Sequence, residues 1–136
     1  MRAYFVNNMY LSSIQNGIQP AHVIHEMFRK YDGVICGDNL EKRLQLYDWA
    51  DNHKTIIVLN GGMTEHLEKF LQLVENSQFT FATFYEPGIG NALTSIGIIV
   101  PEYFYTATEE ELLSNENVDL ITKTLIMTMR TFSLAK

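Results

Sequence analysis

The segment from Tyr85 to Thr94 carries residue types that could do chemistry. It places one acid, two glycines, one amide and one hydroxyl between two apolar runs. Loops of this kind often hold catalytic groups at the end of a rigid sheet. Glu86 could act as a general base that orients water, and Asn91 or Thr94 could stabilise a developing oxyanion. Pro-Gly is also an ordinary turn sequence, so a structural turn with a solvated Glu86 fits the composition equally well.

Three further features of the sequence have a possible chemical role and a simpler structural one. His22 and His25 are three residues apart in a helical pattern, but no third metal ligand is evident, so we expect one to pack and the other to be solvated. The single cysteine, Cys36, follows Val-Ile, an apolar setting that predicts a small buried residue rather than a nucleophile. Gly61 and Gly62 could form an anion-binding turn, but they match no phosphate-binding motif, which favours a tight strand-to-helix turn. We therefore expect neither a metal nor a cofactor.

Composition limits the class of protein. The chain has 136 residues, 46% of them hydrophobic, with 3 Pro and 8 Gly, which predicts one globular domain. A lone cysteine excludes a disulfide framework, and the apolar runs are too short to cross a bilayer, so we expect a soluble cytoplasmic protein. Ten Lys and Arg against 16 Asp and Glu give a net charge of −6. A nucleic-acid partner would need a local basic patch, and none is obvious.

The hydrophobic pattern predicts the elements that must position these residues. Period-two or β-branched runs indicate strands, and three- and four-residue steps indicate helices. The expected strands are residues 3–9, 54–60, 79–85 and 92–100, and the expected helices are residues 18–31, 38–51, 64–76 and 118–134. The strand at 54–60 is continuously apolar, as expected of a strand buried on both faces. Thr108 and Glu111 have the spacing of a capping box.

This order of elements predicts an α/β fold. We expect a three-layer α/β/α sandwich around a small mixed four-stranded sheet in residues 1–101, with a C-terminal helical extension in residues 102–136, all in one domain. The connection between the last two strands is too short for a parallel crossover, so they either form a hairpin or enclose another strand. The apolar stripe from Leu120 to Met129 is expected to be core or a subunit contact rather than part of a cofactor site.

Two segments together resemble the class II peptidyl-tRNA hydrolase family, the archaeal and eukaryotic type. The stretch from Ser13 to Val23 resembles the family's Lys-Gly-Lys-x-Ala-Ala-Gln-Cys-x-His-Ala and matches it at Gln19 and His22. The stretch Glu86-Pro-Gly-Ile-Gly, followed by Thr-Ser-Ile-Gly-Ile, resembles the family's Asp-Ala-Gly-x-Thr and its following strand. The order of the intervening elements also fits, so the likeness covers about residues 3–101.

The resemblance implies a homodimer that hydrolyses the ester between a peptidyl or acyl group and tRNA. In that reaction Glu86 would handle the attacking water, and Asn91 or Thr94 would assist. The substrate-binding positions that the resemblance implies are Ser13, Gln15, Gln19 and His22.

The chain departs from the family at several of these positions. Ser13 and Gln15 stand where the family has two lysines, Glu86 replaces its aspartate, and Gly90 replaces a threonine. Uncharged side chains cannot supply the positive field that lysines would direct at an anionic substrate. Two alternatives therefore remain open beside the family's reaction: a catalytically inactive protein that binds a ligand or another protein in the same cleft, and a divergent hydrolase of a small ester or amide.

Overall fold

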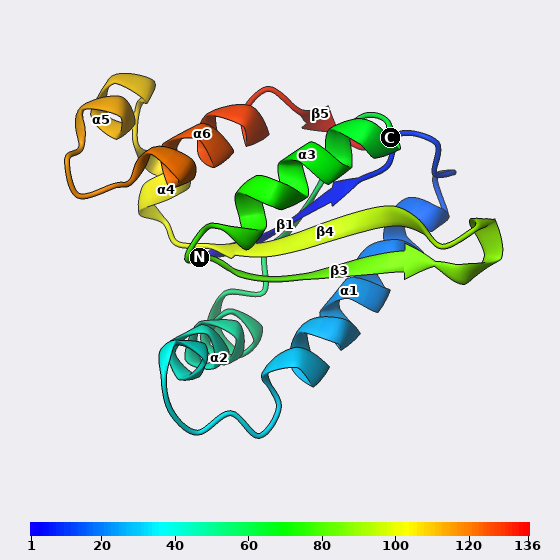
Figure 1. The fold of residues 1–136 in the computed structure, drawn as a ribbon, viewed down its shortest axis with the longest axis horizontal. Coiled ribbons are helices and arrows are strands. Elements are labelled where there is room, and N and C mark those ends of the chain that lie inside the picture. The colour runs from blue at the N-terminus through cyan, green and yellow to red at the C-terminus, as the bar shows by residue number, and fades with distance from the viewer.

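A mixed five-stranded sheet forms the centre of the protein in a computed structural model that describes all 136 residues (Figure 1). This confirms the predicted α/β class. The strand order is β3-β4-β1-β2-β5. The strands are β1 (Arg2–Asn7), β2 (Ile56–Asn60), β3 (Thr80–Glu86), β4 (Ala92–Val100) and β5 (Ser133–Leu134).

The pairing of the strands resolves the question about the last two predicted strands. They are β3 and β4, which pair antiparallel as a hairpin closed by a short 3-10 turn, Pro87–Ile89. β1 pairs parallel with β2 and antiparallel with β4. The sheet has one strand more than the four predicted, because β5 adds to the free edge of β2 in an antiparallel register.

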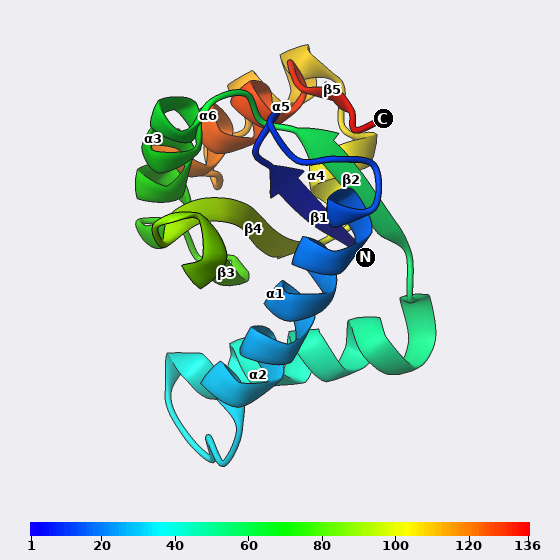
Figure 2. The same ribbon diagram turned by 90° about the vertical axis from the view of Figure 1, so that its right-hand side faces the viewer.

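Helices cover both faces of the sheet, which gives three layers (Figure 2). One face carries α1 (Gln15–Tyr31) and α2 (Asp38–Asp48), the latter followed by a π-helical turn. The other face carries α3 (Thr64–Glu75) and the C-terminal extension. This extension comprises the short helices α4 (Tyr103–Thr106) and α5 (Glu109–Ser114), and α6 (Leu120–Met129).

The caps and ends of the C-terminal helices agree only partly with the sequence pattern. The predicted capping box is confirmed, because the Glu111 amide donates to Thr108 Oγ1 at 3.1 Å and the Thr108 amide donates to Glu111 Oε1 at 3.4 Å. The helix predicted for residues 118–134 is wrong at its end, since α6 stops at Met129. The chain turns there so that Phe132 packs edge-on against Phe70 of α3, and the residues that follow pair with β2.

Each face of the sheet has its own apolar core. On the α1 side, Phe5, Val23 and Met27 are fully buried. They surround Gly97 of β4, where an added Cβ would lie 2.6–2.9 Å from their side-chain atoms. Only glycine therefore allows α1 to pack this closely on β4. This close packing fixes the height of α1 over the β3–β4 hairpin.

Two burial predictions are wrong. β2 is not buried on both faces, since Ile56 is 50% exposed and Val58 is half-buried, because α1 and α2 pack over β1, β3 and β4 instead. Cys36 is exposed, because it lies in the loop between α1 and α2 rather than in an element that faces the core. None of the helices combines the length and the apolar character that crossing a membrane requires.

The docking of α6 on α3 predicts the effect of two matched substitutions. Leu125 is fully buried and Leu120 is 78% exposed on the same helix. We expect Leu125→Ala to lower the free energy of unfolding by about 2–5 kcal/mol, because it leaves a cavity in the core. Leu120→Ala should change it by less than about 0.5 kcal/mol. Urea unfolding measures both, and equal effects would show that α6 does not dock through Leu125.

Candidate functional site

The start of α1 places two glutamines on one face of the helix. The helix begins at Gln15, three residues before the predicted start at Ile18. Ser12 lies just before this first turn, and its Oγ accepts a hydrogen bond from the Gln15 amide at 3.3 Å. Because Gln15 and Gln19 are four residues apart, their side chains lie one helical turn apart on the same face.

Gln19 connects the start of α1 to the β3–β4 hairpin. Its side chain is buried, at 1% exposure. Gln19 Nε2 donates to Gln15 Oε1 at 2.7 Å and to Glu86 Oε2 at 3.0 Å. Gln19 Oε1 accepts from Thr94 Oγ1 at 2.8 Å. Both amide protons and the amide oxygen therefore have partners, and the side chain is held in one orientation.

Glu86 is an ionised carboxylate at the end of β3. Its Oε1 accepts a hydrogen bond from the Gly88 amide at 3.2 Å, and its Oε2 accepts the bond from Gln19. The Gln19 bond, followed by the Gly88 bond, lowers the pKa of Glu86 below its usual value, with a small contribution from the charge of His22. The carboxylate therefore remains charged at neutral pH and can orient a water molecule or a ligand donor.

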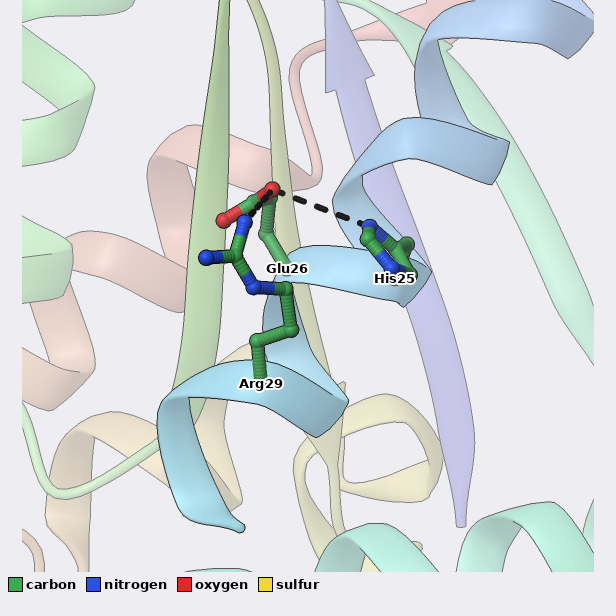
Figure 3. A network of polar contacts seen from close by, with 3 residues as sticks. All are labelled: His25, Glu26 and Arg29. Carbon is green, nitrogen blue, oxygen red and sulfur yellow. Dashed lines mark hydrogen bonds and ion pairs between the residues drawn. The ribbon is translucent and has the colours of Figure 1, made fainter.

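The two histidines of α1 have separate environments. The exposed His22 stacks on Phe84 of β3, with ring centroids 4.2 Å apart and planes at 8°. Figure 3 shows His25 in a different group, where Glu26 Oε1 lies 3.8 Å from His25 Nδ1 and 3.4 Å from Arg29 Nη1. Ion pairs this exposed contribute little stability. The protein has no group of three or more His, Cys, Asp or Glu side chains placed to hold a metal ion.

Besides His22, whose ring makes no hydrogen bond, two of the predicted site residues lie outside this hydrogen-bonded group. Ser13 is exposed in the loop before α1 and makes no side-chain hydrogen bond. Asn91 is exposed with a φ of 60°, and its backbone amide donates to the Glu86 carbonyl at 3.0 Å, so it shapes the hairpin turn. The structure thus brings together Gln15, Gln19, Glu86 and Thr94, with His22 beside them.

A cleft of about 470 Å³ opens over this group. We call it the Glu86 cleft, and it is lined by Tyr10, Leu11, Ser12, Gln15, Gln19, Glu86, Gly88 and Ile89. It contains no Lys or Arg, and Glu86 carries its only formal charge. Gln15 Nε2 donates no hydrogen bond within the protein, so it is a free neutral donor at the edge of the cleft. The cleft therefore offers one anion and uncharged donors.

Sequence reasoning missed a second buried polar network beside the cleft. Asn7, at the end of β1, accepts a hydrogen bond from Ser95 Oγ at 2.6 Å and donates to Asn16 Oδ1 at 2.9 Å. Its neighbour Asn8 donates to Thr64 Oγ1 at 2.9 Å. The signal that could have found this network is the pair of asparagines that ends an otherwise apolar strand. These bonds tie α1, α3 and β4 to the end of β1.

Neither a protein-family model nor a curated protein matches the sequence of this chain.

The bond between Thr94 and Gln19 predicts a measurable contribution to stability. Thr94→Val removes the hydroxyl that satisfies the buried Gln19 Oε1, so we expect the free energy of unfolding to fall by about 1–3 kcal/mol. Thr83 lies on β3 and makes no side-chain hydrogen bond, so Thr83→Val should change it by less than about 0.5 kcal/mol. Denaturant unfolding compares the two variants. Equal stability of Thr94→Val and wild type would contradict the bond.

Proposed function

We propose that the Glu86 cleft hydrolyses the ester between a peptidyl or acyl group and tRNA, the reaction of the class II peptidyl-tRNA hydrolase family. The observation that carries this proposal is the meeting of the two resembling segments. Gln19 and Glu86, 67 residues apart in the sequence, bond directly, and Thr94 bonds to the same amide. These are positions at which the resemblance implies substrate-binding and catalytic groups, and three of the four residues brought together line one cleft.

Glu86 is the group suited to handle the attacking water. Its charged carboxylate accepts a hydrogen bond from water and takes a proton as the water oxygen attacks the acyl carbonyl carbon. The ester C–O bond then breaks, and the proton passes to the departing sugar oxygen. The lowered pKa of Glu86 keeps the carboxylate ionised but makes it a weak base, which predicts a slow reaction.

Gln15 is the group suited to stabilise the oxyanion. It occupies the position of one of the family's lysines, and its Nε2 is free to donate. A single neutral donor aimed at the developing charge typically supports a rate increase of about 10²–10³. Gln15 would thus replace the family's cation with a weaker, uncharged donor.

The alternative is a binding protein without catalysis. It is favoured by one observation, the absence of any Lys or Arg from the lining of the Glu86 cleft. A substrate as highly charged as tRNA is normally held by basic side chains, and the chain carries a net charge of −6. A hydrolase of a small uncharged ester needs no basic side chains to hold its substrate, so the same cleft would suit that activity.

Substitution of Glu86 tests the proposed reaction. We expect Glu86→Gln to lower the rate of peptide release from peptidyl-tRNA by about a hundredfold or more, because the amide cannot accept a proton. The control is Glu65→Gln, the same change on the exposed surface of α3. Wild-type protein that releases peptide from neither peptidyl-tRNA nor a small N-acyl amino acid ester would contradict catalysis. Cleavage of the small ester alone would identify the divergent hydrolase.

Gln15 gives a second, independent test. Gln15→Leu should lower the rate about tenfold or more, because the oxyanion loses its donor, whereas Gln15→Lys should raise the rate on peptidyl-tRNA by restoring a cation. Initial rates are compared with wild type at several salt concentrations. Unchanged rates in both variants would remove Gln15 from the mechanism.

A further inference from the structure

A cavity of about 600 Å³ lies away from the Glu86 cleft, between the β2–α3 turn, α3 and the end of α6. We call it the α3–α6 cavity. Its volume is within the range of about 300–1,000 Å³ that small-molecule sites occupy. None of the residues that line it lines the Glu86 cleft. One wall is formed by the residues from Thr128 to Ser133, which belong to the extension beyond the family resemblance.

Three polar side chains that line this cavity offer hydrogen-bond donors without partners in the protein: those of Asn60, His66 and Lys69. His66 Nδ1 accepts a hydrogen bond from the Met63 amide at 3.3 Å, which assigns the proton of the neutral ring to Nε2. Asn60 Oδ1 accepts from the Gly62 amide at 2.9 Å, which leaves its Nδ2 free. Lys69 forms no ion pair or hydrogen bond, although Glu65 lies one turn away.

One lysine and no acidic residue line the α3–α6 cavity, although acids outnumber bases in the chain. A ligand that fits must therefore supply acceptors, and a negative group beside Lys69 would be favoured.

The other residues that line the cavity indicate the chemistry of the rest of the ligand. Phe70 and Phe132 pack edge to face, with ring centroids 5.4 Å apart, and Leu73 extends this apolar surface. The hydroxyls of Thr128 and Ser133 also belong to the lining, and that of Thr128 donates to the Thr124 carbonyl at 2.7 Å, so it can accept from a ligand. A planar ring system suits the aromatic surface, and sugar hydroxyls suit the threonine and serine side chains. An acyl chain would leave the free donors of Asn60, His66 and Lys69 without partners.

We propose that the α3–α6 cavity binds a nucleoside monophosphate group, with the base on the apolar wall and the phosphate at Lys69. Two sources supply this group: a free nucleotide, and the terminal nucleotide of an RNA chain. A third hollow of about 320 Å³ shares Met9, Asn60 and Ser133 with the cavity and Leu11 with the Glu86 cleft. The hollow therefore adjoins both sites. Binding itself does not depend on the proposed hydrolysis.

Nuclear magnetic resonance of the full-length, ¹⁵N-labelled protein tests this proposal with adenosine monophosphate as the probe. We expect saturable shifts of the Gly61, Gly62 and Thr131 amides, with a Kd below about 1 mM. Adenosine and inorganic phosphate should each bind about tenfold more weakly. No shift with either the nucleotide or a short RNA, or shifts confined to the Glu86 cleft, would overturn the proposal. Octanoate binding as tightly as the nucleotide would also overturn it.

The two sources of the nucleotide, a free nucleotide and the end of an RNA chain, are distinguished by comparing the affinities of the mononucleotide and a short RNA. An RNA of a few nucleotides that binds at least tenfold more tightly than the mononucleotide, with the same amide shifts, identifies a terminal nucleotide. Equal or weaker RNA binding identifies a free nucleotide.

A matched pair of substitutions tests whether Lys69 binds the phosphate. Lys69→Met retains the length of the side chain without its charge, and we expect it to weaken nucleotide binding about tenfold or more. Lys54→Met makes the same change at an exposed residue that lines neither the cavity nor the cleft. It should leave the Kd within about twofold. Equal Kd values for the two variants would contradict a phosphate contact at Lys69. The amide shifts report binding whether or not Glu86 is catalytic.

Discussion

The buried amide of Gln19 is the interaction on which the arrangement of the Glu86 cleft depends. A buried amide that lacks partners costs about 1–3 kcal/mol per unpaired group, so α1 must sit where Glu86, Thr94 and Gln15 meet it. The close packing of α1 over Gly97 makes this position reachable. One side chain therefore couples the position of a helix to the end of a hairpin that lies 67 residues further along the chain.

The Glu86 cleft and the α3–α6 cavity differ in charge. The Glu86 cleft holds a single anion, whose pKa is lowered by Gln19 and Gly88, and has a neutral glutamine where the resembling family has a lysine. The α3–α6 cavity holds Lys69 and no acid. A ligand with an uncharged reactive part for the Glu86 cleft and an anionic part for Lys69 would therefore fit these charges better than a ligand that is anionic throughout. Lys69 of α3 thus supplies, beside the C-terminal extension, the positive charge that the cleft lacks.

The order of elements up to β4 could be predicted from the sequence, because each long apolar run there is either clearly periodic or continuously β-branched. The site was only partly predictable. Gln19, Glu86 and Thr94 could be named as candidates from residue type and motif, but their hydrogen bonds depend on the packing of α1 against the hairpin. Because α1 was predicted to begin at Ile18, the sequence did not show that Gln15 and Gln19 lie on the same face of the helix. The end of α6 was missed because Phe132 continues a helical apolar pattern while it packs against Phe70 from outside the helix.

The side-chain amide of Gln19 shows most directly whether Gln19 and Glu86 are bonded as described above. In a pH titration followed by ¹H–¹⁵N spectra, we expect the Gln19 Nε2 resonances to shift with the ionisation of Glu86, at a midpoint below the usual glutamate value of about 4.3. Their exchange with solvent should be slower than that of the exposed Gln72. Gln19 resonances that do not change with pH, and that exchange as fast as those of Gln72, would contradict the account.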